Sequence, residues 1–188
     1  MFLVASKIPK SVAIQKHLTS IHIDNWLKQD VFLLRWWLLL GLIFVALLLW
    51  WKLLHKSKLN EIFLFTVLAT ILALGLVEYG EELTLWDYPT DIIPIFPPLT
   101  SINLISLPLI YSLIYQYFRT KKSFLWATLI ITAVICFILE PILVWGDFYQ
   151  LLHWHYFFSF PIYVLIALFT RTFVIKICKI TEKYRNME

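Results

Sequence analysis

The chain has 188 residues, of which 61% are hydrophobic and 15% are charged. A soluble domain is only about 45–50% apolar, so a water-soluble core of this size could not hide so many apolar side chains, and lipid must cover part of the surface. The net charge of +4 does not indicate nucleic-acid binding, because the basic residues stand at the ends of apolar segments and not on one solvated face. We therefore expect the lipid bilayer as a partner, and no nucleic acid.

Residues 1–32 precede the first long apolar run and form a separate piece. Their apolar residues recur at near-helical spacing, with lysines among them: Val12, Ile14, Leu18 and Ile21 beside Lys10 and Lys16. This pattern is typical of an amphipathic segment that lies on the membrane surface. We expect such a segment at the outer surface or against a neighbouring subunit; the alternative is a flexible tail.

Five later segments are apolar over about the 20 residues that a helix needs to cross the hydrocarbon core. They are residues 33–53, 62–79, 101–118, 124–144 and 156–174. Tryptophan pairs flank the first segment, at residues 36–37 and 50–51, and indole rings prefer the headgroup level. The sequence therefore predicts an all-α integral membrane protein, with a five-helix transmembrane domain over residues 33–175 behind the N-terminal amphipathic segment.

The charges in the connections predict the orientation of the helices. Basic residues stand at three places. Lys52, Lys56 and Lys58 lie at the end of the first span and after it, and Arg119, Lys121 and Lys122 follow the third span. Further basic residues lie in the tail at 176–188. Acidic residues occupy the connections 80–100 and 145–155. Because basic loops stay in the cytoplasm, the C-terminal tail should be cytoplasmic in the plasma membrane. Five spans then place the N-terminus outside, although its own lysines resist translocation.

The outer connection at residues 84–100 is rich in proline, with Pro89, Pro94, Pro97 and Pro98. Proline fixes φ and lacks an N–H group, so this stretch cannot be helical. Apolar residues such as Trp86 accompany the prolines. We expect an extended apolar loop at the outer interface that covers the helix ends or contacts another protein.

Glu140 is the strongest candidate for a functional residue, because an ionisable group inside a span costs about 2.5–3.5 kcal/mol on insertion scales. It precedes Pro141, which frees a backbone carbonyl one turn earlier and favours a kink. Thr128, Thr132 and Cys136 precede it at steps of four, which places all four residues on one helix face. This semi-polar stripe is either a proton or cation path or an ordinary helix-packing surface.

A second group of ionisable residues stands in the outer connections. It contains Glu78, Glu81, Glu82, Asp147, His153 and His155. Glu78 and Glu82 share a helix face, where two like charges repel unless a cation or partner intervenes. With Glu140 they are predicted either to form one outward acidic cluster or to make an ordinary hydrated rim. The two histidines alone do not indicate a metal site, so we expect no metal and no cofactor.

The central part of the chain resembles a family of short, uncharacterised multi-spanning membrane proteins of spore-forming Firmicutes such as bacilli and clostridia. The matching pieces run in order from Trp51-Lys52-Leu53 through Trp86-x-Tyr88-Pro89, Leu107-Pro108 and Tyr115-Gln116-Tyr117-Phe118 to Glu140-Pro141 and Ser159-Phe160-Pro161. They cover roughly residues 50–165. The resemblance implies a protein of the plasma membrane or the spore inner membrane and brings no assigned activity or catalytic residue.

Nucleophile and phosphate-binding motifs are absent from the sequence, which favours a function other than catalysis. The leading hypothesis is a structural membrane protein that self-associates into a homo-oligomer or lattice, in the setting of the spore inner membrane. The alternative is a small proton or cation channel, or a transporter subunit, with Glu140, Glu78 and Glu82 at its outer mouth. A membrane enzyme or metal site at His153, His155 and Glu140 is a third hypothesis.

Overall fold

The computed structural model describes residues 9–90, 92–93 and 102–185, and most of them are helical. The helices are α1 (Lys10–Asn25), α2 (Leu34–Leu53), α3 (Leu59–Glu82), α4 (Ile102–Tyr117), α5 (Lys121–Val134), α6 (Glu140–Trp145) and α7 (Tyr156–Arg185). Two π-helical turns, η1 (Trp26–Asp30) and η3 (Ile135–Leu139), extend α1 and join α5 to α6, and a 3-10 turn, η2 (Lys56–Lys58), leads into α3. Strands β1 (Trp86–Asp87) and β2 (Gln150–Leu151) form a short antiparallel pair. The all-α membrane class predicted from hydropathy is confirmed at this level.

Four helical segments of the described chain are long and apolar enough to cross a membrane: Leu34–Leu53, Lys56–Glu82, Lys121–Trp145 and Tyr156–Arg185. The predicted span at 101–118 corresponds to α4, which has 16 residues. At 1.5 Å per residue α4 is about 24 Å long, whereas the hydrocarbon core is about 30 Å thick. The count of five spans is therefore not confirmed, because α4 by itself is too short. The last span is longer than predicted, since α7 continues as helix through most of the expected tail.

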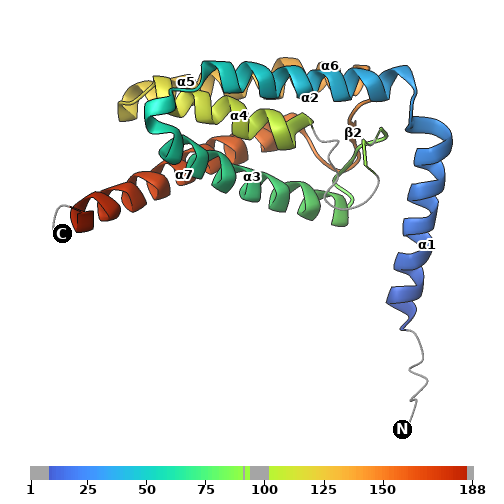
Figure 1. Cartoon of the computed structure of the whole chain (residues 1–188). Helices are drawn as coiled ribbons and strands as arrows, with labels where there is room; N and C mark the ends of the chain where they lie inside the picture. Colours follow the sequence, from blue (N-terminus) through green and yellow to red (C-terminus); the bar gives the residue numbers. More distant parts are fainter. Residues whose placement is uncertain (1–8, 91, 94–101, 186–188) are drawn as a thin grey trace, which may run out of the picture.

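Figure 1 shows that α4 nevertheless runs through the bundle, antiparallel to α3, so the chain returns before α5 begins. The turn from α2 to α3, the turn from α4 to α5 and the end of α7 lie at the same end of the molecule (Figure 1). These segments carry most of the basic residues, and the acidic connections lie at the opposite end, where α1 and the start of α2 add a smaller number of basic residues. We call them the basic end and the acidic end. The separation of charge expected from the sequence is thus present in the fold.

The core lies between α3, α4, α5 and α7. Its largest buried rings include Phe65 on α3, Tyr111 on α4 and Phe124 on α5. Phe65 stacks on Tyr115 with ring centroids 4.7 Å apart, and small residues such as Ala69 and Ala167 allow the backbones to approach. Small residues are what close helix contacts in lipid require.

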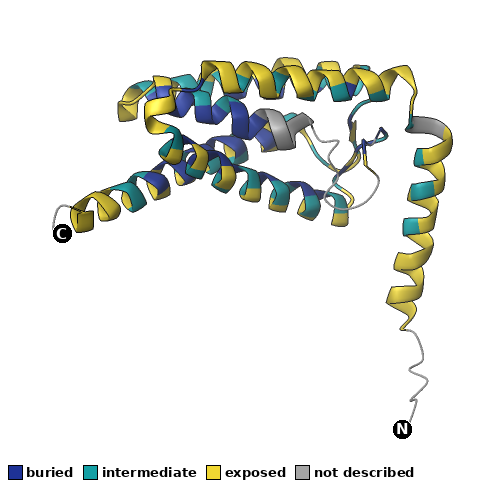
Figure 2. Cartoon of the chain, in the orientation of Figure 1, coloured by how far each residue is buried: buried dark blue, intermediate teal, exposed yellow. Residues whose placement is uncertain are grey.

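Helix α2 lies on the outside of this core, and most of its surface is exposed apolar side chain (Figure 2). Leu39 is its one buried residue. Polar contacts attach it to the bundle: Trp50 donates to Ser112 Oγ at 2.7 Å, and Trp36 donates to the Ile92 carbonyl at 3.2 Å. Both tryptophans, expected only as interface anchors, also tie α2 to its neighbours.

Helix α1 projects from the acidic end and runs across the direction of the bundle helices (Figure 1). None of its residues is buried. A turn at Phe32, with φ of 64°, separates it from α2. A helix that leaves the bundle sideways at one end is compatible with a surface position, but its apolar residues are not gathered on one face, so the amphipathic character predicted for residues 1–32 is not confirmed. Residues 1–8 lie outside the described chain.

The described part of the outer loop folds back onto the helix ends. Trp86 pairs with Leu151 in the β1–β2 ladder, and its ring lies on Gly80, where an added Cβ would come within 1.9 Å of Cζ2. The ring also meets Trp154 edge-on at 5.1 Å. The predicted cover over the helix ends is present at residues 84–90, while most of the proline run, at 94–98, lies outside the described residues.

Candidate functional site

Glu140 begins α6 directly after the π-helical turn η3. Pro141 has no N–H to offer the carbonyl four residues earlier, which breaks the α-helical pattern at this point. The chain responds with the wider π turn, a feature often found at functional sites. Glu140 is 0% exposed and lies inside the bundle. The predicted disturbance at Pro141 is therefore a π turn just before it.

The carboxyl group of Glu140 faces hydroxyl-bearing residues of α7. Ser159 and Tyr163 are the two hydroxyl-bearing residues that interact with it. Even so, neither carboxyl oxygen makes a hydrogen bond of ordinary geometry within the described residues. Ser159 also accepts a hydrogen bond from Trp154 Nε1 at 3.0 Å, which leaves its own O–H available to donate toward the carboxyl group. A fully buried carboxyl group usually makes well-formed hydrogen bonds, so Glu140 is an exception.

Aromatic residues of the acidic end close the site. Tyr149 is buried and stacks on Tyr88 with ring centroids 5.1 Å apart. Burial raises the pKa of Tyr149 above its usual range, and the neighbouring Tyr88 and Glu140 add to that shift. The Tyr149 phenol is therefore a neutral hydrogen-bonding group and not a second charge beside Glu140.

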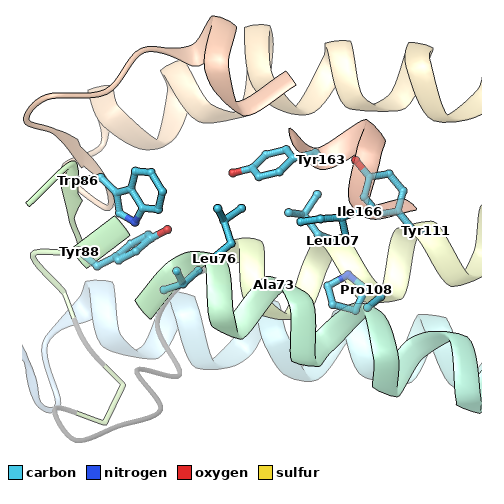
Figure 3. A pocket seen from close by; sticks show the side chains of 11 residues that line it. Ala73, Leu76, Trp86, Tyr88, Leu107, Pro108, Tyr111, Tyr163 and Ile166 are labelled. Carbon is cyan, nitrogen blue, oxygen red and sulfur yellow. The ribbon is translucent and has the colours of Figure 1, made fainter. Parts of the chain in front are cut away.

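A small cavity of about 20 Å³ adjoins the site between α3, α4 and α7. Tyr163 lines it and also approaches Glu140, so the cavity and the carboxyl group share this residue. The Tyr163 hydroxyl points toward Trp86 (Figure 3). Trp86 Nε1 is buried and has no hydrogen-bond partner among the described residues. The space is enough for about one water molecule.

The predicted semi-polar stripe faces the interior along its whole length. Thr128, Thr132, Cys136 and Glu140 are all 0% exposed. Thr132 and the Tyr111 hydroxyl share a hydrogen bond of 2.8 Å. The hydroxyl of Thr128 has no partner within the described residues. The stripe thus joins the buried acid to the middle of the bundle.

Two further polar residues stand toward the basic end, and the sequence reasoning did not select either. Arg171 on α7 is 8% exposed, donates to the Arg119 carbonyl at 2.7 Å and lies over the Phe124 ring at 4.7 Å. Glu61 on α3 accepts a short hydrogen bond from the Tyr115 hydroxyl. Arg171 interrupts an otherwise apolar run, which was the available signal. It lies inside the span predicted at 156–174, where an ionisable residue is a functional hypothesis by default.

The residues expected around the outer mouth stay at the surface of the acidic end. Glu78 and Glu81 are partly buried, while Glu82, Asp147, His153 and His155 are exposed. Asp147 lies 3.4 Å from Arg35. The structure separates Glu140 from this rim, because α6 turns its carboxyl inward toward α7. The predicted single acidic cluster is thus two groups, a rim and one buried acid.

The two histidines do not converge on a site. His153 Nδ1 lies 3.1 Å from the Thr84 carbonyl, and the His155 ring stacks on Phe157 with centroids 5.1 Å apart. Within the described ranges, no three His, Cys, Asp or Glu residues are grouped as a metal ion would require. The hypothesis of a metal site at His153, His155 and Glu140 gains no geometric support.

No protein-family model matches the chain, and no characterised protein or solved structure is significantly similar to it. The resemblance to a membrane-protein family of spore formers therefore rests on the sequence motifs alone.

Proposed function

We propose that this protein is a small proton-conducting membrane protein, a channel or a transporter subunit, in which Glu140 binds and releases the proton. One observation carries the proposal: Glu140 is completely buried inside an apolar bundle, where its carboxyl group faces the hydroxyl groups of Ser159 and Tyr163 and pairs with no cation in the described chain. Ionisable residues inside membrane bundles mark ion and proton pathways often enough to be a functional hypothesis by default.

The energetics favour use of this acid over mere tolerance. A charged carboxylate in a low-dielectric interior costs several kcal/mol unless it is firmly paired. A packing role would be filled as well by leucine or glutamine. The free energy of burying a glutamate is offset by a function only if its carboxyl group binds and releases a proton. This requires water to enter the bundle beside it.

The surroundings of Glu140 supply the elements of a path. The water-sized cavity beside Tyr163 lies on one side of it, and the Thr132–Tyr111 hydrogen bond lies further along the stripe. Thr128 and Thr170 add buried hydroxyls without partners among the described residues. Hydroxyl groups and single waters relay protons only when they form a connected chain, so this path requires additional water during conduction. Glu78 and Glu82 serve as the outer mouth in this proposal.

The test is proton flux into liposomes that contain the purified protein. A potassium gradient with valinomycin drives protons inward, and an entrapped dye reports the internal pH. Glu140→Gln keeps the shape and removes the titrating group, so it should abolish the flux. Asp87→Asn, which changes an exposed acid at the same end of the bundle, should not. Equal flux through wild type and Glu140→Gln, or no flux through wild type above protein-free liposomes, overturns the proposal.

A structural role is the second candidate, and a different observation favours it. Helix α1 buries none of its residues and α2 buries only Leu39, so both offer apolar surface to a second copy as well as to lipid. In this proposal the protein forms a homo-oligomer or lattice without enzymatic activity; the spore inner membrane as its location comes from the resemblance. A strictly monomeric state in native-lipid nanodiscs would exclude it.

Both proposals use the same placement in the membrane. We put the basic end on the cytoplasmic side, in accord with the distribution of basic residues. The C-terminal end of α7 is then cytoplasmic, and α1 lies at the outer surface.

A further inference from the structure

A wide groove runs between α4 and α5 on the lipid-facing side of the bundle. Its volume is about 510 Å³, and its walls are almost entirely apolar. Ile110, Leu113 and Ile114 of α4 form one wall, and Trp126, Ala127 and Ile130 of α5 form the other. From Ile110 to Tyr117 it follows about 10 Å of α4, whereas the hydrocarbon depth of one leaflet is about 15 Å. The groove is therefore long enough to hold the greater part of one acyl chain, and its apolar walls suit it.

The groove opens at the basic end, beside three cationic side chains. Arg119, Lys121 and Lys122 are exposed. No carboxylate lies within salt-bridge distance of them in the described part of the chain. Ser123 lines the groove at this end, and its backbone N–H is already taken by the Thr120 side chain at 3.1 Å. An apolar trough that ends in unneutralised positive charge is complementary to an anionic amphiphile.

Charge also argues against a second copy of this chain as the occupant. Copies in one membrane share their orientation, so a second copy would bring its own basic end to the same depth. Both turns at that end are basic: the α4–α5 turn carries the three cations of the groove, and the α2–α3 turn carries Lys52, Lys56 and Lys58. The basic residues of two copies at the same depth would repel each other. An anionic headgroup, in contrast, binds more tightly with each nearby Lys or Arg.

We propose that the α4–α5 groove is a binding site for an anionic phospholipid. One acyl chain lies between Ile114 and Trp126, and the phosphate is held by Lys121 and Lys122, with Arg119 beside them. This site is separate from Glu140 and stands whether or not the protein conducts protons.

Native mass spectrometry of the full-length protein in detergent tests the proposal, with phosphatidylglycerol as the anionic probe and phosphatidylcholine as the neutral one. Wild type should retain phosphatidylglycerol in preference. Lys121→Gln/Lys122→Gln should weaken that retention about thirtyfold, following the gain expected from two nearby cations. Ala127→Trp, which fills the groove, should weaken retention of both lipids. The matched control, Lys179→Gln/Lys183→Gln, removes two exposed basic residues near the end of α7, which contributes no residue to the groove, and should change nothing.

Three results would overturn the proposal. The first is equal retention of the two lipids by wild type. The second is an equal loss in the Lys121/Lys122 variant and in the Lys179/Lys183 control, which would mean that only overall charge matters. The third is a dimer that Ala127→Trp disperses, which would show that a second copy occupies the groove. Both lysine pairs are exposed, so these variants should fold, and thermal unfolding of each variant verifies it.

Discussion

The contact between Gly80 and Trp86 offers a sharp test of how the acidic end is built. A Cβ at position 80 would lie 1.9 Å from Cζ2 and 2.3 Å from Cε2 of the Trp86 ring. The ring cannot slide aside, because Val77, Tyr88 and Tyr149 pack around it and its backbone is paired in the β1–β2 ladder. Gly80→Ala must therefore push the whole indole out of its place.

The magnitude follows from two opposing effects. Loss of a buried tryptophan ring costs about 3–5 kcal/mol, and replacing a helical glycine by alanine returns at most about 1 kcal/mol. We expect Gly80→Ala to lower the free energy of unfolding by about 2–4 kcal/mol. Gly75→Ala is the matched control on the same helix, because a Cβ there meets nothing within 4 Å. That variant should be unchanged or slightly more stable.

Unfolding from mixed micelles by increasing amounts of SDS, followed by tryptophan fluorescence, measures both variants. A second substitution, Trp86→Phe, should recover part of the stability lost in Gly80→Ala, because the smaller ring leaves room for the methyl group. If Gly80→Ala proves as stable as Gly75→Ala, the described placement of Trp86 on α3 is wrong.

Two further predictions concern buried polar contacts. Tyr111→Phe removes the 2.8 Å hydrogen bond to Thr132 and leaves a buried hydroxyl without its partner, so the free energy of unfolding should fall by about 1–2 kcal/mol. In a double-mutant cycle Thr132→Val should then cost less on the Tyr111→Phe background than alone; additive losses would contradict the contact. Arg171→Lys keeps the charge but loses the fork over Phe124 and the bond to the Arg119 carbonyl. Proteolysis at the α4–α5 turn should therefore accelerate about threefold to tenfold, as expected for a loss of about 1 kcal/mol, and an unchanged rate would refute the role of Arg171.

Much of the architecture could be read along the chain. The apolar runs predicted the helices at 33–53, 62–79 and 124–144 to within a few residues of α2, α3 and α5–α6. Hydropathy and charge are local properties of a segment, so lipid exposure and the gathering of basic connections at one end follow without knowledge of packing. The steps of four from Thr128 to Glu140 likewise placed these residues on one face, which is a property of the helix alone.

Other features depended on contacts between segments far apart in the sequence. The spacing of residues in the sequence does not show whether Glu140 lies at the surface rim or inside the bundle. The π turn before Pro141 and the packing of α6 against α7 determine that its side chain is buried. The same holds for Arg171, whose place over Phe124 exists only once α5 and α7 meet. The sequence did not show that α4 is shorter than a full span, because the apolar run at 101–118 is long enough to predict one.

The sequence by itself determined that this is a helical membrane protein with opposite charge at its two ends, because residue type and spacing along one segment are sufficient for both. The tertiary structure alone decided which helix faces are buried and which acid is enclosed. It also decided that Trp86 covers Gly80, and that α4 and α5 leave a groove beside the basic end. Those outcomes depend on the relative position of helices, and packing between distant segments sets that position.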